Sequence, residues 1–455
     1  MPLNEGQTVQ YTVITTRVPD GTTLYWKTTG NTTNSDIVGG NTGSVTITNN
    51  QAVFNVTTFS DVSTDGTKTL GIALSTGSLN GPTVVSTSNS IVVEDTSLSP
   101  VNRIYAWGSG TYASLGLNDQ GINRSSPTQI GSDTTWTDIS SGAVNALAIK
   151  DGMLLTWGGN YQGRLGLNDT VNRSSPVQVG SGTNWSTVTA GLGSCFAIKT
   201  NGTLWSWGNG AYGILGLNLP NGTYKSSPIQ VGTDTNWSQI EAREHALAIK
   251  TDGTLWSWGF NNLGQLGQNF AVPDSTSSPT QIGSDSTWSK IATYNWYSMA
   301  IKTNGTLWSW GYNPFGTLGQ NNTNSFSSPT QVGALTNWSN VALGAGNAVA
   351  VKNDGTLWTW GQAYGGALGN QNPNTNKSSP IQVGTDTSWS NCFAAQYDVS
   401  ALKTNNTLWT WGANDGGLLG QNDTIFRSSP TQVGALSTWK LVAMGQYQNF
   451  GIEGS

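Results

Sequence analysis

The stretch Thr203-Leu204-Trp205-Ser206-Trp207-Gly208 recurs in close copies through the last 350 or so residues of the chain. Its Trp-Gly pair occurs seven times, at intervals of 50 to 52 residues, with the tryptophans at Trp107, Trp157, Trp207, Trp258, Trp310, Trp360 and Trp411. A second series follows at Trp136, Trp185, Trp237, Trp288, Trp338, Trp389 and Trp439. A period held this constant predicts a repeated structural unit, with most of the tryptophan in its framework.

Each period contains four short β-rich runs, which in the third copy are residues 187–191, 195–199, 203–207 and 228–231. The pair Asn201-Gly202 separates the second run from the third and is typical of a tight hairpin turn. Four antiparallel strands cannot bury their own apolar face, so seven such units close most simply into a ring. The sequence therefore predicts an all-β fold with a seven-bladed β-propeller.

Both ends of the repeat region are incomplete units. The region begins at Arg103-Ile104-Tyr105-Ala106-Trp107, a third strand with no first or second strand before it. It ends with residues 439–453, which supply a first and a second strand with no third strand after them. We therefore expect one blade to be assembled from both ends, which would leave no open sheet edge.

The repeat resembles the regulator of chromosome condensation family. The resemblance covers residues 103–453 and is carried by Ala190-Gly191, Ala248-Ile249-Lys250, Asp252-Gly253, Trp258-Gly259 and Gly264-Gln265-Leu266-Gly267. It implies the propeller fold but no single function, because propellers of this family include a nucleotide-exchange factor on chromatin and a plant ultraviolet-B photoreceptor.

Residues 1–97 lack the repeat. They hold six or seven β-rich runs with period-2 alternation, separated by turn signals such as Pro19-Asp20-Gly21, which predicts a small immunoglobulin-like β-sandwich in front of the propeller. Residues 98–102 are the expected linker, and residues 103–455 the propeller. The segments 5–13 and 19–26 resemble modules in structural proteins of tailed marine bacteriophages.

A looser resemblance links residues 65–70 and 91–95 to Calx-β sandwiches, some of which bind calcium through carboxylates. It implies a weak possibility of a calcium site formed by Asp61, Asp65, Glu94 and Asp95; the alternative is that these are solvated turn carboxylates. No other cofactor is expected, and no metal site is expected in the propeller.

Composition excludes several functions. The net charge is −5 with 9% charged residues, and no repeat carries the basic stripe that a nucleic-acid partner needs. The chain has two cysteines in different blades, one histidine, and no phosphate-binding loop or nucleophile motif, so we expect no enzyme activity. Its amino terminus lacks a signal-peptide pattern, and no apolar run is long enough to span a bilayer.

The repeats differ from one another on one face only. The turns between second and third strands and the connections between blades are nearly constant, and we call their side of the disc the constant face. The opposite, variable face carries the connections from first to second and from third to fourth strand. Its candidate binding residues are Tyr294, Asn295, Trp296, Tyr297, Tyr112, Tyr161, Tyr212, Tyr312, Phe315, Tyr364, Arg243, His245, Tyr397 and Tyr447.

These aromatic rings suit a protein contact or stacking against sugars. The alternative for the repeated rings is that they cap the blades and pack against the next blade. Tyr294-Asn295-Trp296-Tyr297 occurs in one blade only, which favours recognition. His245 also stands where the family has a structural histidine.

These patterns, together with the resemblance, predict a non-enzymatic structural and binding protein of a phage virion. The N-terminal domain would contact other virion proteins, and the propeller would bind a host-surface glycan or protein, as a tail adhesin or a head decoration protein. The alternative is a cellular regulatory propeller of the same family that binds a protein partner. A light-sensing role is a third hypothesis, for which Trp296 alone offers little support.

Overall fold

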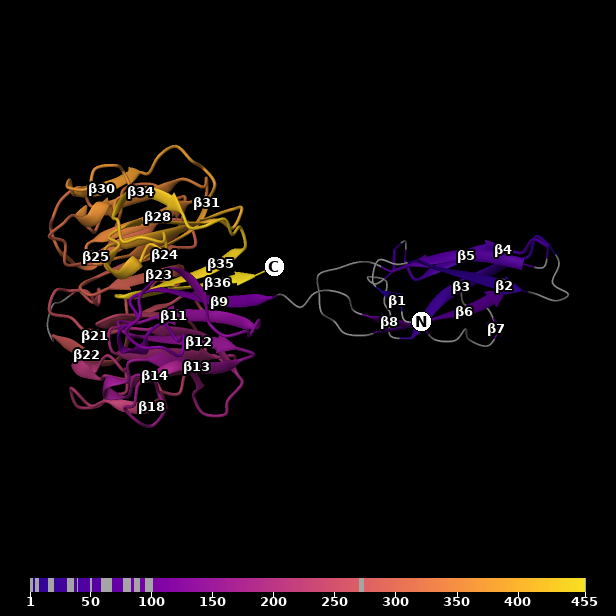
Figure 1. Cartoon of the computed structure of the whole chain (residues 1–455), viewed down its shortest axis with the longest axis horizontal. Helices are drawn as coiled ribbons and strands as arrows, with labels where there is room; N and C mark the ends of the chain where they lie inside the picture. Colours follow the sequence, from indigo (N-terminus) through magenta and orange to yellow (C-terminus); the bar gives the residue numbers. More distant parts are fainter. Residues whose placement is uncertain are drawn as a thin grey trace. The chain divides into compact units, whose positions relative to one another are not determined.

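This computed structural model describes residues 3–4, 8–14, 20–30, 37–38, 40–49, 51–58, 68–76, 83–85, 91–94, 101–269 and 274–454. The chain divides into two compact units, Met1–Pro100 and Val101–Ser455, which are treated one at a time below (Figure 1).

The described strands of the second unit form seven four-stranded antiparallel sheets, numbered here as blades 1 to 7. Blades 1 to 3 are β11 (Trp136–Ser141), β12 (Asn145–Lys150), β13 (Met153–Gly158) and β14 (Arg173–Gln178); β15 (Trp185–Ala190), β16 (Ser194–Lys199), β17 (Leu204–Gly208) and β18 (Lys225–Gln230); and β19 (Trp237–Ala242), β20 (His245–Lys250), β21 (Leu255–Phe260) and β22 (Ser275–Gln281). Blades 4 to 6 are β23 (Trp288–Tyr294), β24 (Tyr297–Lys302), β25 (Leu307–Gly311) and β26 (Phe326–Gln331); β27 (Trp338–Leu343), β28 (Asn347–Lys352), β29 (Leu357–Gly361) and β30 (Lys377–Gln382); and β31 (Trp389–Ala394), β32 (Asp398–Lys403), β33 (Leu408–Gly412) and β34 (Arg427–Gln432).

Blade 7 is assembled from both ends of the unit. Its strand order is β10-β9-β36-β35, where β9 (Asn102–Gly108) and β10 (Arg124–Gln129) open the unit and β35 (Trp439–Met444) and β36 (Gln448–Gly454) end it. The central pair β9 and β36 is in register from Gly108 opposite Gln448 to Asn102 opposite Gly454. Hydrogen bonds between the first and last strands therefore close the ring.

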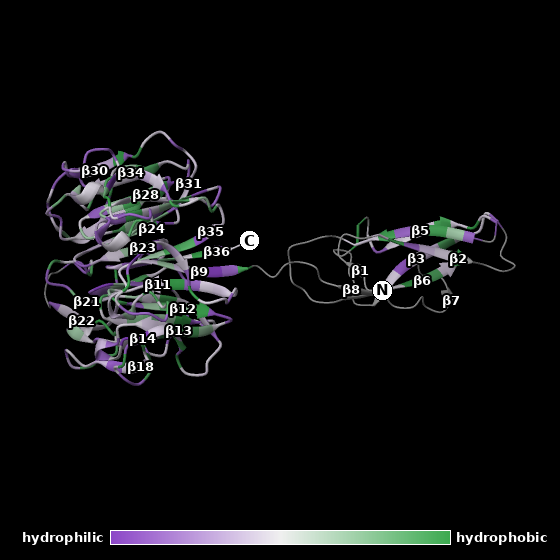
Figure 2. Ribbon diagram, viewed as in Figure 1, coloured by the Kyte–Doolittle hydropathy of each residue, from purple (hydrophilic) through white to green (hydrophobic). Residues whose placement is uncertain are grey.

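Short 3-10 turns follow the third strand in five blades: η2 (Thr111–Ala113), η3 (Tyr161–Gly163), η4 (Ala211–Gly213), η5 (Tyr364–Gly366) and η6 (Asp415–Gly417). Figure 2 places the most hydrophobic stretches of the second unit along strands such as β35, with hydrophilic residues on many of the connecting loops.

The Trp-Gly and Leu-Gly motifs form one contact between neighbouring blades. The indole Nε1 of Trp258 donates to the Ile214 carbonyl oxygen of the preceding blade at 2.7 Å. The ring lies so close to Gly216 that a Cβ there would stand 2.9 Å from Nε1, and Gly216 has a φ of +68°. Only glycine accommodates both the close approach and the left-handed backbone. The two motifs therefore recur at one period because each needs the other.

The second tryptophan series holds the repeat lysine. In blade 3 the Lys250 ammonium stands 4.7 Å from the Trp237 ring centroid and 3.9 Å from that of Trp256, and it pairs with Asp234 at 2.8 Å. A cation over an indole face is attracted by the ring quadrupole. The same arrangement recurs in blades 4 and 6, around Lys302 and Lys403.

The first unit contains two sheets. One has the order β1-β8-β6-β3-β4 with β7 paired to β6, and the other consists of β2 and β5. The strands are β1 (Leu3–Asn4), β2 (Thr8–Ile14), β3 (Thr23–Gly30), β4 (Thr42–Thr46), β5 (Gln51–Thr57), β6 (Lys68–Thr76), β7 (Thr83–Val85) and β8 (Ile91–Glu94).

The core of the first unit joins the two sheets. Phe54 of β5 stacks on Trp26 of β3 at 5.0 Å between ring centroids and on Tyr11 of β2 at 5.5 Å. The more specific immunoglobulin-like assignment stays a prediction. So does the calcium site, because Asp61, Asp65 and Asp95 lie outside the described residues and only the backbone of Glu94 is described.

Candidate binding surfaces

The strand order places all of the varying connections on the same side of the disc. In a meander of antiparallel strands, the connection from first to second strand and the connection from third to fourth strand leave the sheet at one edge. Five of the residues predicted for the variable face have exposed side chains: Tyr112, Tyr161, Tyr212, Tyr364 and Tyr447. Tyr161 has the largest exposed fraction, 70%. Tyr312, Phe315 and Tyr397 are half-buried.

Two of these rings also pack on the following blade, as the alternative explanation required. Tyr212 lies 4.4 Å from Phe260 between ring centroids, and Tyr364 lies 4.6 Å from Tyr397. Both tyrosines remain exposed on their other side. Tyr212 and Tyr364 therefore pack on the following blade and also remain available to a binding partner.

The blade 4 cluster is mostly buried, contrary to its predicted place on an exposed surface. Strand β23 extends through Tyr294 and β24 begins at Tyr297, so Asn295 and Trp296 alone form the connection. Tyr294 and Tyr297 are 4% and 2% exposed, and the Tyr297 hydroxyl donates to the Gly344 carbonyl of blade 5. Trp296 is 36% exposed and keeps the predicted location.

Arg243 and His245 are buried too, which corrects their assignment to the exposed face. The Arg243 guanidinium stacks 4.6 Å from the Tyr294 ring centroid and donates to its hydroxyl at 3.1 Å. The His245 Nε2 lies 2.6 Å from the Ser298 hydroxyl, which itself donates to the Gln265 carbonyl, so Nε2 is the donor. Burial lowers the His245 pKa to about 4. Both residues connect blade 3 to blade 4.

His245 belongs to a ring of buried polar residues. The first residue of every second strand is polar and almost fully buried: Asn145, Ser194, His245, Tyr297, Asn347, Asp398 and Gln448. Asp398 is the member that can carry a negative charge. Its Oδ2 accepts from Asn449 Nδ2 at 2.8 Å, but burial raises its pKa to about 7.

We expect Asp398→Asn to stabilise the propeller at high pH. The folded-state pKa of Asp398 lies above its ordinary value, so the folded protein holds an extra proton between about pH 4 and 7 and loses stability as the pH rises through this window. Asparagine, which occupies the same place at Asn145 and Asn347, avoids that charge. The expected gain at pH 8.5 is on the order of 2–4 kcal/mol, falling towards zero at pH 4.

Denaturant unfolding of both proteins at pH 4 and pH 8.5 measures this difference. Asp274→Asn, at an exposed position, is the matched control and should change stability little at either pH. A gain for Asp398→Asn that is the same at both pH values would contradict the buried-charge explanation.

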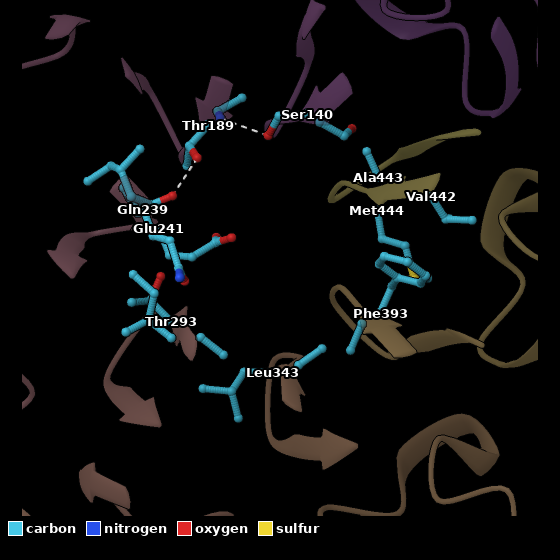
Figure 3. A pocket seen from close by; sticks show the side chains of 18 of the residues that line it. Ser140, Thr189, Gln239, Glu241, Thr293, Leu343, Phe393, Val442, Ala443 and Met444 are labelled. Atoms are coloured by element: carbon cyan, nitrogen blue, oxygen red, sulfur yellow. Dashed lines mark hydrogen bonds between the residues drawn. The ribbon is translucent and has the colours of Figure 1, made fainter. Parts of the chain in front are cut away.

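A second candidate site lies along the axis of the ring. The first strands of all seven blades, β11, β15, β19, β23, β27, β31 and β35, line a cavity of about 390 Å³ (Figure 3). Neighbouring first strands are joined around it: the Val188 amide donates to Asp138 Oδ2 at 3.0 Å, and the Thr189 hydroxyl donates to the Ile240 carbonyl at 2.7 Å. The channel wall is thus hydrogen-bonded between blades 1, 2 and 3.

The channel contains two carboxyl groups that sequence reasoning missed. Glu241 is exposed to the channel but has protein all around it; this desolvation, with a contribution from the charge of Asp138, raises its pKa to about 7. Burial raises the pKa of Asp138 to about 6, in spite of amide hydrogen bonds from Ile139 and Val188. A comparison of the seven first strands position by position would have found them.

Within the described ranges, no three His, Cys, Asp or Glu side chains are grouped so as to hold a metal ion. The same ranges contain no helix with the length and apolar character of a membrane span. Cys195 and Cys392 are buried free thiols.

The seven four-stranded sheets, arranged around a central channel and closed through blade 7, define a β-propeller repeat protein. The family model of the RCC1-like domain matches residues 103–451. The chain therefore belongs to the RCC1-like family.

Comparisons with individual proteins agree with this assignment. The ultraviolet-B receptor UVR8 of Arabidopsis thaliana is 27% identical over 228 residues, which are 48% of this chain and 51% of the receptor. The structure of human WBSCR16 has a TM-score of 0.70 at 20% identity and covers 77% of this chain and 98% of its own. The structure of yeast RCC1 (Prp20) bound to Kap60 has a TM-score of 0.67 at 19% identity and covers 78% of this chain and 89% of its own.

These two solved structures support the fold alone. The matched region spans about half the length of UVR8 and about a quarter of the zebrafish (Danio rerio) RCC2 homolog.

Proposed function

We propose that the protein is a non-enzymatic binding protein that recognises a protein partner through an exposed apolar arc on the variable face. The arc runs over four neighbouring blades, 6, 7, 1 and 2, and its members are Ile425, Phe426, Tyr112, Ile122, Tyr161, Val171, Tyr212 and Tyr224, all exposed. Large apolar side chains gathered on loops of a rigid scaffold are typical of an interaction surface. This arc is the observation that carries the proposal.

Charge close to the arc is already compensated within the propeller. Arg124 pairs with Asp119, Arg173 with Asp169 and Arg427 with Asp423; each aspartate lies in the connection from third to fourth strand, and each arginine begins the fourth strand. Few charges are therefore left to attract a polyanion or a strongly charged partner. Contact would depend on apolar burial, ring stacking and neutral hydrogen bonds.

Binding through this surface is expected to depend weakly on salt. Raising the salt from roughly 50 to 200 mM should change the affinity by less than about tenfold, whereas a binder making 6–10 phosphate contacts would lose about 10³-fold or more. Tyr112→Ala, Tyr161→Ala and Tyr212→Ala in one variant should weaken binding at least about tenfold. Thermal unfolding should change little, because these rings are exposed.

A photo-crosslinking residue at Tyr161 should capture the partner, identified by mass spectrometry, and the affinity of that partner can then be measured at both salt concentrations. The matched control carries the crosslinker at Asn304, which is exposed in the turn between β24 and β25, on the constant face. Equal crosslinking from Asn304 and Tyr161, or full affinity in the triple variant, would exclude the arc as the binding surface.

We also propose where the protein acts. It would be a virion component of a tailed phage, attached through residues 1–97 and displaying the propeller to a host-surface glycan or protein. Support comes from the resemblance of segments 5–13 and 19–26 to phage structural modules. A labelled protein should copurify with assembled particles.

A cellular regulatory propeller is the second candidate, favoured by the similarity to UVR8. A diffuse cellular signal with none in particles would favour this candidate over the virion.

A further inference from the structure

The central channel has two unlike walls. Blades 1 to 3 contribute Ser140, Thr189, Gln239 and Glu241, whereas blades 5 to 7 contribute the large apolar side chains of Leu343, Phe393 and Met444, beside Asn340 and Asn391. Figure 3 shows Glu241 on one side of the opening, with Phe393 and Met444 across from it. A cavity of about 390 Å³ falls within the range of small-molecule sites, which combine apolar walls with a few placed polar groups.

Glu241 is an unsatisfied carboxyl group in this cavity. Among the described residues its carboxylate makes no hydrogen bond and no ion pair, and it projects from the fifth position of β19 into the channel. The equivalent positions in the other first strands carry Ser140, Thr189, Ala292, Ala342, Phe393 and Ala443, none of them ionisable. A carboxylate placed here has no role in holding the blades together.

Asp138 adds a second negative charge to the same wall. Its oxygens are engaged by the amides of Ile139 at 2.9 Å and Val188 at 3.0 Å, which fix its position. It is close enough for its charge to act on Glu241. Asp138 therefore contributes electrostatic potential, and Glu241 has its oxygens available for a ligand.

We propose that the channel binds a monovalent organic cation with an apolar body, a primary arylalkyl- or alkylammonium. Its ammonium would donate to Glu241 in the field of Asp138, and its hydrocarbon part would lie against Phe393, Met444 and Leu343. A metal ion fits less well, because Leu343, Phe393 and Met444 offer it no oxygen ligand. This site is separate from the apolar arc, so either proposal can fail without the other.

Two cationic residues also line the channel. The Arg243 guanidinium is stacked on Tyr294 and lies next to Glu244, whose pKa is affected by the charge of Arg243. Lys290 of blade 4 is exposed and competes with a bound ammonium for the carboxylates. Removing the Lys290 charge should therefore leave binding unchanged or strengthen it, and Lys290→Gln is the matched control for Glu241→Gln.

Isothermal titration calorimetry of the full chain with 2-phenylethylammonium chloride tests the proposal, with 2-phenylethanol as the uncharged probe. At pH 8.5 the wild type should bind the amine, and the alcohol should bind at least about tenfold more weakly. Glu241→Gln should weaken amine binding about tenfold, whereas Lys290→Gln should not weaken it. Methylammonium, which lacks the apolar body, should bind more weakly than the arylalkylammonium.

The effect of pH has a defined sign. The amine stays protonated from pH 5 to 8.5, but Glu241 and Asp138 take up protons as the pH falls below about 7 and 6. Binding should therefore weaken at pH 5. Thermal unfolding of each variant establishes that it is folded. No binding by the folded wild type, equal binding of amine and alcohol, or undiminished binding in folded Glu241→Gln would each overturn the proposal.

Discussion

Deletion of residues 439–455 is expected to make the propeller aggregate. The deletion removes β35 and β36, and β9, which keeps β10 on its other edge, loses its partner β36 along the whole register from Gly108 to Asn102. It also removes Phe450, whose ring lies 5.5 Å from that of Trp157 in blade 1. An unpaired, apolar sheet edge is a template for association between chains.

Size-exclusion chromatography and thermal unfolding measure this outcome. Deletion of residues 1–100 is the matched control, because it removes a separate compact unit and should leave a monomeric propeller with nearly the same transition. A monomeric protein with an unchanged thermal transition after loss of residues 439–455 would show that closure through blade 7 is not needed.

Trp207→Ala should cost about 3–5 kcal/mol of the free energy of unfolding. The side chain is completely buried in the core of blades 1 and 2, and its Nε1 donates to the Arg164 carbonyl at 2.9 Å. The Cys195 thiol also donates to that carbonyl, at 3.2 Å, so the variant keeps one donor there. The expected loss therefore comes mainly from the cavity left by the indole.

Trp296→Ala is the comparison for this prediction. Trp296 is 36% exposed and touches Tyr312 at 6.1 Å between ring centroids, so its removal should cost about 1–2 kcal/mol. Denaturant unfolding at one pH compares the two variants. Equal losses would mean that Trp296 belongs to the framework as Trp207 does.

The strand pattern could be predicted because each blade repeats the same local signals. The Trp-Gly pair, the Leu-Gly pair and the hairpin turns fix the strands almost alone, since each motif acts within one blade or on its neighbour. Which side chains are buried near the varying connections was harder to predict. Tyr294 and Tyr297 look like loop aromatics in the sequence, but the hairpin between them has only two residues, and the strands carry both rings between blades.

The channel could not be found by reading along the chain. Asp138 and Glu241 lie in different repeats, each in a strand that otherwise follows the pattern, and they meet only because the ring brings equivalent positions together. Of the predicted binding residues, Tyr112, Tyr161, Tyr212 and Tyr364 are exposed, and their role in binding stays a prediction. The apolar partners Ile122, Val171 and Ile425 were missed because single aliphatic residues in polar loops carry little signal.

The pairing of β9 with β36 also determines when the ring can be completed during synthesis. Arg103 and Glu453, which form an ion pair in blade 7, are 350 residues apart in the sequence. At about 5–20 residues per second, a ribosome needs roughly 20–70 s to make the residues between them. During that time β9 can pair with β10 on one edge, but β36 is missing from its other edge. The nascent chain can therefore associate with other chains through that edge until β36 emerges.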